Sequence, residues 1–439
     1  MRIANPRFPL VAQSFASKRA IMGALTLAAV FFSFSVGSRS ISVLLSLTGV
    51  TLAASILGNL DLKYCLRALI SPFSALALAI AGASIFATDA IASKVLLGVS
   101  LTYLFARLAR AVFPLSWLLG GVAINGFIVG LLGEFGKTAM AEMIPLIGLL
   151  VSNLGKNQTG WTLAFGIVAA VTLAFRLQKH YALRSVNLIM VIGYAALILA
   201  SDSVTAGLAA GFALLLIPVA AVGLRFFKLA MTRAYLLPLW LSAIVGGTLI
   251  VVPAVLNVFR DFFSPKTGGY NLRSFTELTG RDKIWGCYRS SGLDSAADLL
   301  TETSHCVESL GAPGIGHLHS IYYETHLLMG WLGVTLLFAG FGFVAAVTLV
   351  LIRKAASVEG FLGGLFSLGV LVVGSLVGVT ESFLYHKLVF GAFVFFLGAP
   401  VSLHFGLRPV LSSQIRAKMR TIFRGMRAPR LVKKSSRKF

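Results

Sequence analysis

Apolar runs recur along most of the chain, and each is about as long as a helix that crosses a lipid bilayer. A hydrocarbon core takes roughly 20 helical residues. Because 57% of the 439 residues are hydrophobic and only 12% are charged, we expect an all-α, polytopic membrane bundle and exclude water-soluble classes. About twelve runs qualify as spans: residues 20–36, 41–60, 68–88, 90–106, 111–132, 159–175, 185–201, 205–224, 234–256, 327–352, 360–380 and 388–407.

The basic residues mark one face of this expected bundle. A formal net charge of +23 would suggest nucleic-acid binding in a soluble protein. Here most lysines and arginines lie in alternate connections and in the tail at 408–439, a pattern that governs membrane topology. We therefore expect no nucleic-acid partner and two cytoplasmic termini. The tail should rest on anionic lipid of the bilayer.

One connection is much longer than the others on the face opposite the termini. Residues 257–318 are hydrophilic, and loops of this length are usually functional or disordered. Part of this stretch has helical apolar spacing, so we expect a small helical cap between spans one to nine (1–256) and spans ten to twelve (319–407). Cys287 and Cys306 both lie in the cap, and an oxidising compartment would allow them to form a disulfide.

Polar residues gather on the same face as the long connection. The clearest stretches are KNQTGW (156–161), SDSVTAG (201–207) and FTELTGRDKIW (275–285). Polar side chains at a membrane face are functional candidates, because each must be solvated, paired or used. The candidates in or beside these stretches are Lys156, Asn157, Ser201, Ser203, Arg273, Arg281, Lys283 and Arg289.

Three histidines and a glutamate precede the tenth apolar run. The spacing of His317, His319, Glu324 and His326 matches no established metal site, and the chain has no GxxxxGK[ST] phosphate loop, so we expect no metal or other cofactor. A neutral imidazole is a suitable proton acceptor near pH 7. The alternative is that these histidines are solvated at the membrane interface. Glu324 would lie off the helical face of His319, and we give it no role beyond an acceptor contact.

The order of these stretches resembles that in the O-antigen ligase and Wzy-type polysaccharide polymerase superfamily. GRDKIW (280–285) is similar to the family's arginine-and-tryptophan element in a large periplasmic loop, and His319-Ser320 stands where the family has a His-Asn pair before a span. LGKNQTGW is similar to its Lys-Asn element. SDSVTAG is similar to its Ser-x-Ser-Arg/Lys-Thr-Ala element, although Val204 replaces the basic residue.

The resemblance implies a GT-C-like bundle in the bacterial inner membrane, with the long loop periplasmic. Its partners would be an oligosaccharide on undecaprenyl diphosphate and a glycan acceptor. Arg281 would stabilise the departing diphosphate, since a guanidinium pairs with phosphate oxygens and stays charged, and His319 would accept the proton of the attacking sugar hydroxyl. The other basic and polar candidates would bind substrate, and Lys156 or Arg273 would have to supply the charge that Val204 lacks.

Two enzymes and one transporter fit this sequence. A polymerase joins lipid-linked repeat units, and we expect this activity because the ligase-like element is broken at Val204. An O-antigen ligase would instead transfer the glycan to the lipid A core. A transporter or flippase normally places polar residues near the bilayer midplane, in two related halves. Here the polar residues gather at one face, which favours surface chemistry over passage.

Overall fold

The fold is all-helical within the part of the chain that the structure, a computed structural model, describes. These residues are 18–36, 72–86, 90–135, 156–177, 180–201, 203–225, 233–263, 281–290, 318–355, 358–384 and 390–398. The helices are α1 (Lys18–Val36), α4 (Pro72–Phe86), α5 (Ala90–Val112), α6 (Leu115–Phe135), α9 (Lys156–Arg176), α10 (Tyr181–Ala200), α11 (Val204–Arg225), α12 (Arg233–Phe263), α13 (Arg281–Ser290), α15 (Ile321–Lys354) and α16 (Val358–Thr380). Residues 390–398 form one further helical segment.

Seven of the described helices are long and apolar enough to cross a bilayer. They are α6, α9, α10, α11, α12, α15 and α16. The apolar helices over Ala20–Ser35 and Ser74–Phe86 are shorter, and the expected span at 41–60 lies outside the described residues. The prediction of an all-α membrane protein is therefore confirmed at this level, while a count near twelve stays a prediction.

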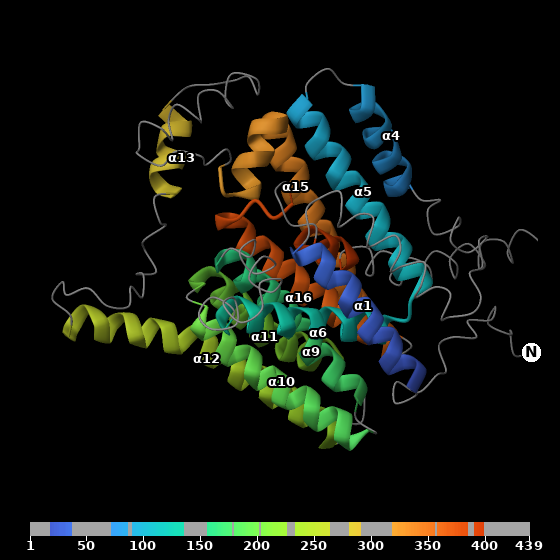
Figure 1. The fold of residues 1–439 in the computed structure, drawn as a ribbon, viewed down its shortest axis with the longest axis vertical. Helices are drawn as coiled ribbons and strands as arrows, with labels where there is room; N and C mark the ends of the chain where they lie inside the picture. Colours follow the sequence, from blue (N-terminus) through green and yellow to red (C-terminus); the bar gives the residue numbers. More distant parts are fainter. Residues whose placement is uncertain are drawn as a thin grey trace, which may run out of the picture.

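The helix α9 lies at the centre of the bundle, with α6, α11 and α16 around it (Figure 1). Small side chains allow this packing, because membrane helices associate through close contact rather than a hydrophobic driving force. Gly126 of α6 faces Gly166 of α9, and a Cβ on Gly126 would lie 3.0 Å from the Gly166 Cα. Tyr194 of α10 fills the remaining space and donates a hydrogen bond to the Ala123 carbonyl. Three helices are therefore fixed together at one point.

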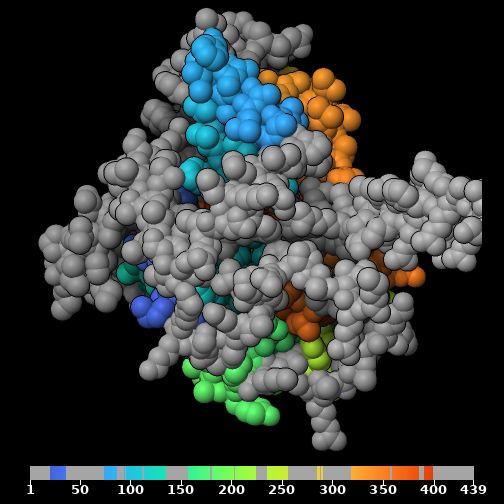
Figure 2. Space-filling model, turned by 90° about the vertical axis from the view of Figure 1, so that its right-hand side faces the viewer, coloured from blue at the N-terminus to red at the C-terminus, as the bar shows by residue number. Residues whose placement is uncertain are grey.

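A pair of helices flanks this core. The helices α4 and α5 pack against each other, and Figures 1 and 2 show them at the end of the molecule that also carries part of α15. The ring of Tyr103 in α5 meets Phe396 edge-on, with 5.7 Å between centroids. The side chains of Leu76, Ile85 and Phe86 on α4 are exposed, which suits a surface in contact with lipid.

Contacts between helix ends show that α9 runs antiparallel to α16 and α12. Where α9 ends, Arg176 pairs with Glu359 at the start of α16, with 3.3 Å between nitrogen and oxygen. Phe175 also lies against Tyr235 at the start of α12, with ring centroids 6.3 Å apart. We define the Arg176 end of the bundle by these four residues.

The opposite helix ends meet at the other end of the bundle. Gly160, near the start of α9, packs against Ser203 just ahead of α11. Ile321, the first residue of α15, packs against Gly378 near the end of α16. His319 immediately precedes α15, so we define the His319 end by these five residues. The KNQTGW and SDSVTAG stretches therefore lie at the end that carries His319.

The helix α15 consists of two helical segments joined at Gly330. This glycine has φ 61° and ψ −163°, in the left-handed half of backbone space that residues with a Cβ rarely adopt. The bend returns the leading segment, 321–329, towards the span that follows. The ring of Tyr322 stacks on Phe338 with centroids 5.1 Å apart and also meets Phe341.

Two described helices extend beyond the spans expected around the cap. The tenth helix begins at Ile321 rather than at 327, because its first segment packs on the cap before the span starts. The span-length apolar part of α12 ends at Val255, close to the expected limit at 256, and the helix itself continues to Phe263. Beyond Pro253, which lies inside the helix, the next proline is Pro265, and a proline disfavours helix in the residue before it. The part of 257–318 with helical apolar spacing, residues 293–310, lies outside the described residues.

Candidate functional site

The turn between α10 and α11 is built from buried serines. The Ser201 hydroxyl donates to the Ile198 carbonyl over 2.8 Å, and the Ser203 N–H donates to the Ser201 hydroxyl over 3.4 Å. Both serines are buried, and Ser203 lies against Gly160 of α9. These contacts hold the start of α11 beside the start of α9. The predicted substrate contacts of Ser201 and Ser203 stay predictions.

A chain of contacts joins the start of α9 to the residues around His319. The Trp161 ring, at the end of KNQTGW, lies 6.3 Å from that of Phe383, just after α16. The neighbouring Ser382 hydroxyl donates to Glu324 Oε1 over 3.3 Å. Glu324 also accepts the backbone N–H of Leu318, over 2.6 Å. The stretch that resembles the Lys-Asn element is therefore packed into the same framework as His319.

His319 has an unusual backbone conformation and a half-buried side chain. Its φ is 53°, and no other non-glycine residue in the described ranges has a positive φ. Its Nδ1 atom is buried. Both neighbours of His319 are held: the Trp285 indole donates to the Leu318 carbonyl over 2.8 Å, and the Ser320 hydroxyl donates to the Gly378 carbonyl over 3.3 Å. Backbone outliers that are fixed in this way cluster at functional sites.

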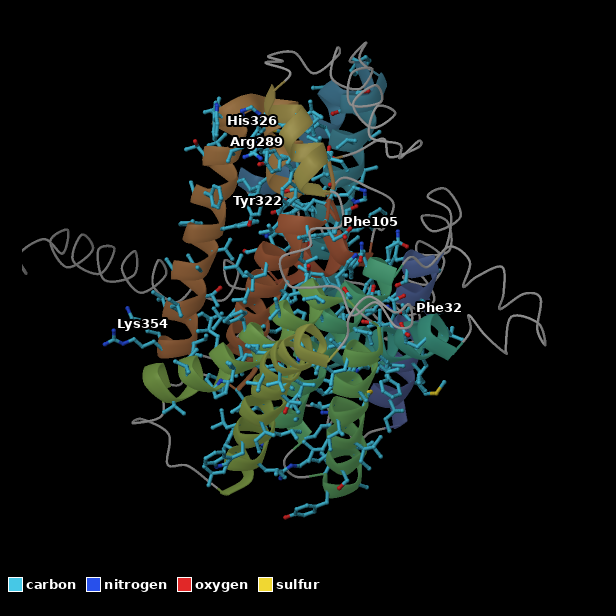
Figure 3. The ribbon with its side chains drawn as sticks, turned by 90° about the vertical axis from the view of Figure 1, so that its left-hand side faces the viewer. Phe32, Phe105, Arg289, Tyr322, His326 and Lys354 are labelled. Atoms are coloured by element: carbon cyan, nitrogen blue, oxygen red, sulfur yellow. The ribbon has the colours of Figure 1, made fainter. Side chains whose placement is uncertain are left out.

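The short helix α13 docks on the leading segment of α15 through aromatic rings. Trp285 stacks on Tyr323 with centroids 5.1 Å apart, and Tyr288 meets Tyr323 edge-on at 5.7 Å. The Tyr288 hydroxyl and His326 Nδ1 are 2.6 Å apart. His326 in turn meets Trp331 beyond the bend, at 4.7 Å. Figure 3 shows Arg289 and His326 together at this end of the molecule.

The predicted arginines of the cap belong to α13 or lie outside the described residues. Arg281 is the first residue of α13, one turn ahead of Trp285. The Trp285 indole donates a hydrogen bond to the carbonyl of Leu318, the residue before His319. The side chains of Arg281 and Lys283 are not among those described. Arg289 is exposed, and its Nε donates to the Trp285 carbonyl of the same helix over 3.2 Å. The convergence of Arg281 and His319 stays a prediction.

The remaining predicted residues fall near the start of α9 or in the cap. Lys156 begins α9, one turn ahead of Gly160, and Asn157 is half-buried. The side chain of Lys156 lies outside the described part. The described part also does not include Arg273, His317 or the predicted disulfide between Cys287 and Cys306.

No family model and no curated protein matches the chain. The site is therefore interpreted from its own geometry. Within the described ranges, no three histidine, cysteine, aspartate or glutamate side chains group so as to hold a metal ion.

The sequence predicted an acceptor contact for Glu324, but it did not predict which residues position this site. Glu324, Tyr288 and Ser382 make their contacts with residues up to 58 positions away. One signal was present for α13: Trp285 and Tyr288 are three residues apart and therefore share a helical face. That spacing indicates a helix with one aromatic side and hence a docked cap helix.

Docking of α13 should be lost at alkaline pH. Burial, then the charges of Glu324 and Tyr323, raise the pKa of Tyr288 above its ordinary value. A raised pKa means that the docked state prefers the protonated phenol. Docking is therefore complete below the unfolded value of about 10 and is lost as the pH rises through the higher, folded value. Near-ultraviolet circular dichroism against pH reports the stacked rings.

The Tyr288→Phe variant isolates this effect. It should lack the alkaline step and should weaken α13 docking at neutral pH by about 1–3 kcal/mol, because His326 Nδ1 loses its partner. Tyr181→Phe is the matched control, since Tyr181 is 78% exposed at the Arg176 end. An alkaline step in Tyr288→Phe equal to that of the native protein would contradict the assignment.

Proposed function

We propose that the protein is a membrane glycosyltransferase that polymerises lipid-linked polysaccharide repeat units. It transfers a glycan from undecaprenyl diphosphate to a sugar hydroxyl at the periplasmic face of the bacterial inner membrane. The observation that carries the proposal is the gathering at one bundle end of the start of α9, the α10–α11 turn and the held backbone of His319. These are the stretches in which the sequence resembles the polymerase and ligase superfamily.

The distribution of basic residues supports the orientation. The helix α15 ends with Arg353 and Lys354, and Ile352 beside them packs on Gly364 near the start of α16, so these cations lie at the Arg176 end. Basic connections favour the cytoplasm. In the proposal the His319 end is therefore periplasmic, the termini are cytoplasmic, and about twelve spans complete the bundle.

The chemistry needs a proton acceptor and positive charge, and no nucleotide or metal. The sugar hydroxyl attacks the anomeric carbon of the donor, and the bond from that carbon to the diphosphate oxygen breaks. His319 takes the hydroxyl proton, and Arg281 pairs with the diphosphate as it leaves. The helices α9, α11 and α15 all begin at the His319 end. Helix N-termini favour anions, so they add to the positive potential there.

A lysine on α9 can supply the charge missing at Val204. Lys156 and Gly160 are one turn apart and share a helical face, and Gly160 contacts Ser203, the neighbour of Val204. Lys156→Ala should reduce transfer by about 10–100-fold, since a hydrogen bond to a charged group contributes roughly 1.5–3 kcal/mol. Adding Val204→Arg should restore much of this loss.

The measurement is the initial rate of glycan transfer at fixed protein level. Lys354→Ala is the control, because this lysine lies at the opposite end of the bundle. If the double variant is as slow as Lys156→Ala alone, the relocated charge does not serve the donor, and Lys156 has another role.

The activity itself is tested with protein purified into proteoliposomes. A carrier-linked repeat unit is added alone or with lipid A core, and the products are separated by length. A polymerase forms longer carrier-linked chains in the first mixture, whereas a ligase forms product only in the second. A flippase moves the lipid across the bilayer without forming any new product. Failure of transfer in both mixtures would refute the proposed function.

A further inference from the structure

The conformation of His319 requires an external constraint. At φ 53° a residue with a Cβ is less stable than in its ordinary conformations by roughly 1–2 kcal/mol. Such a conformation persists when the surrounding structure fixes it on both sides. The residues that fix Leu318 and Ser320 therefore decide where the His319 imidazole lies.

The Glu324 side chain holds the residue before His319, and the first backbone hydrogen bond of α15 holds the residue after it. The Glu324 Oε1 atom accepts the N–H of Leu318 over 2.6 Å, and the Glu324 backbone N–H donates to the Ser320 carbonyl over 2.9 Å. The side chain thus reaches back over the first turn of α15 to the residue before His319. A carboxylate is favoured at this position, because the N-terminal end of a helix carries partial positive charge.

The surroundings of Glu324 suit a structural constraint rather than a reacting group. The residue is only 4% exposed, so a substrate cannot approach it readily. Its Oε1 also accepts the Ser382 hydroxyl over 3.3 Å, which ties the carboxylate to the end of α16. A buried carboxylate that loses such donors is costly, and this cost resists any shift of Leu318.

We propose that Glu324 is a positioning residue that keeps His319 in the left-handed conformation and so aims its imidazole at the substrate. The aim of the imidazole at the substrate rests on the proposed function. The constraint that keeps His319 in the left-handed conformation concerns only the backbone and is independent of any activity.

Three variants separate positioning from other roles. Glu324→Ala removes the acceptor for the Leu318 N–H. Glu324→Gln keeps an amide oxygen that can accept the same hydrogen bond, but it cannot exchange a proton. Tyr322→Phe is the matched control: it removes another bond between the first turn of α15 and the C-terminal part of α16, from the Tyr322 hydroxyl to the Ser375 carbonyl over 2.9 Å, without touching Leu318 or Ser320.

The first measurement is hydrogen exchange at the Leu318 amide in the full-length protein. Glu324→Ala should accelerate exchange by roughly tenfold or more, since a hydrogen bond to a charged group is lost. Glu324→Gln and Tyr322→Phe should remain close to the native rate. Native-like exchange in Glu324→Ala would overturn the inference whatever the activity.

The second measurement is glycan transfer. Glu324→Ala should lower kcat on the order of 10²-fold with little change in KM, because a small displacement of a catalytic group has that effect. Glu324→Gln should retain most of the rate, and Tyr322→Phe should be nearly native. If Gln is as inactive as Ala, Glu324 is itself a reacting group and the positioning role is wrong. If Leu318 loses protection in Glu324→Ala while the native protein transfers no glycan in either proteoliposome mixture, the constraint stands and the proposed function fails.

Discussion

Replacing His319 with asparagine should slow glycan transfer by about 10²–10⁴-fold while the protein stays folded. Asparagine is the informative choice because it enters the left-handed region more readily than most residues with a Cβ, and His319 has φ 53°. The backbone can therefore keep its native path. What is lost is an imidazole that accepts a proton near pH 7.

The measurement is the transfer rate in proteoliposomes, with the amount of folded protein checked by size-exclusion chromatography. His180→Asn is the matched control: this histidine precedes α10 at the Arg176 end, and its replacement should leave the rate unchanged. Full activity of His319→Asn would remove the base from the mechanism. Arg281→Ala should slow glycan transfer by a comparable factor, and the amount of folded protein should again be normal.

Adding one methyl group at Gly166 should destabilise the bundle by about 1–3 kcal/mol, the usual cost of overpacking a core. A Cβ at this position would overlap the Tyr194 hydroxyl and lie 2.7 Å from the ring carbon that carries it. Tyr194 is fully buried, so its ring cannot move aside into solvent. Gly166→Ala should therefore lower the midpoint of thermal unfolding in detergent.

Two further variants identify the cause of that loss. Gly340→Ala adds the same methyl group in α15 where nothing lies within 4 Å, and it should be neutral or slightly stabilising. Combining Gly166→Ala with Tyr194→Phe should cost less than the sum of the two single changes, because the nearest clashing atom is gone. Strict additivity would show that Gly166 does not press on this tyrosine.

The sequence predicted the membrane helices well, because the length of an apolar run is itself the physical requirement. The expected spans at 159–175, 205–224 and 360–380 correspond to α9, α11 and α16 within a few residues. The bend in α15 was not predictable in the same way. Glycine is common in membrane helices, and nothing in the local pattern distinguishes Gly330 from Gly340 or Gly342.

The role of Glu324 was missed for a specific reason. The expectation assumed that His319 and Glu324 lie on one helix, five residues apart and on different faces. The structure places His319 before the helix, with φ 53°, so helical spacing does not apply. The expected acceptor contact exists, but its donors are the Leu318 backbone and the Ser382 hydroxyl, and both depend on tertiary packing.

The bend at Gly330 also sets the depth of the candidate site. From His319 the chain rises through 321–329 to the bend and then descends, so that Tyr322 meets Phe338 lower on the same helix. Figure 3 shows Tyr322 below His326 and Arg289. Within the described residues, His319, three positions before Tyr322, therefore precedes the rise to the bend. Under the proposed function, a donor tethered by a polyprenyl tail cannot rise far above the headgroups, so an imidazole set below the bend would meet it while the tail stays in hydrocarbon.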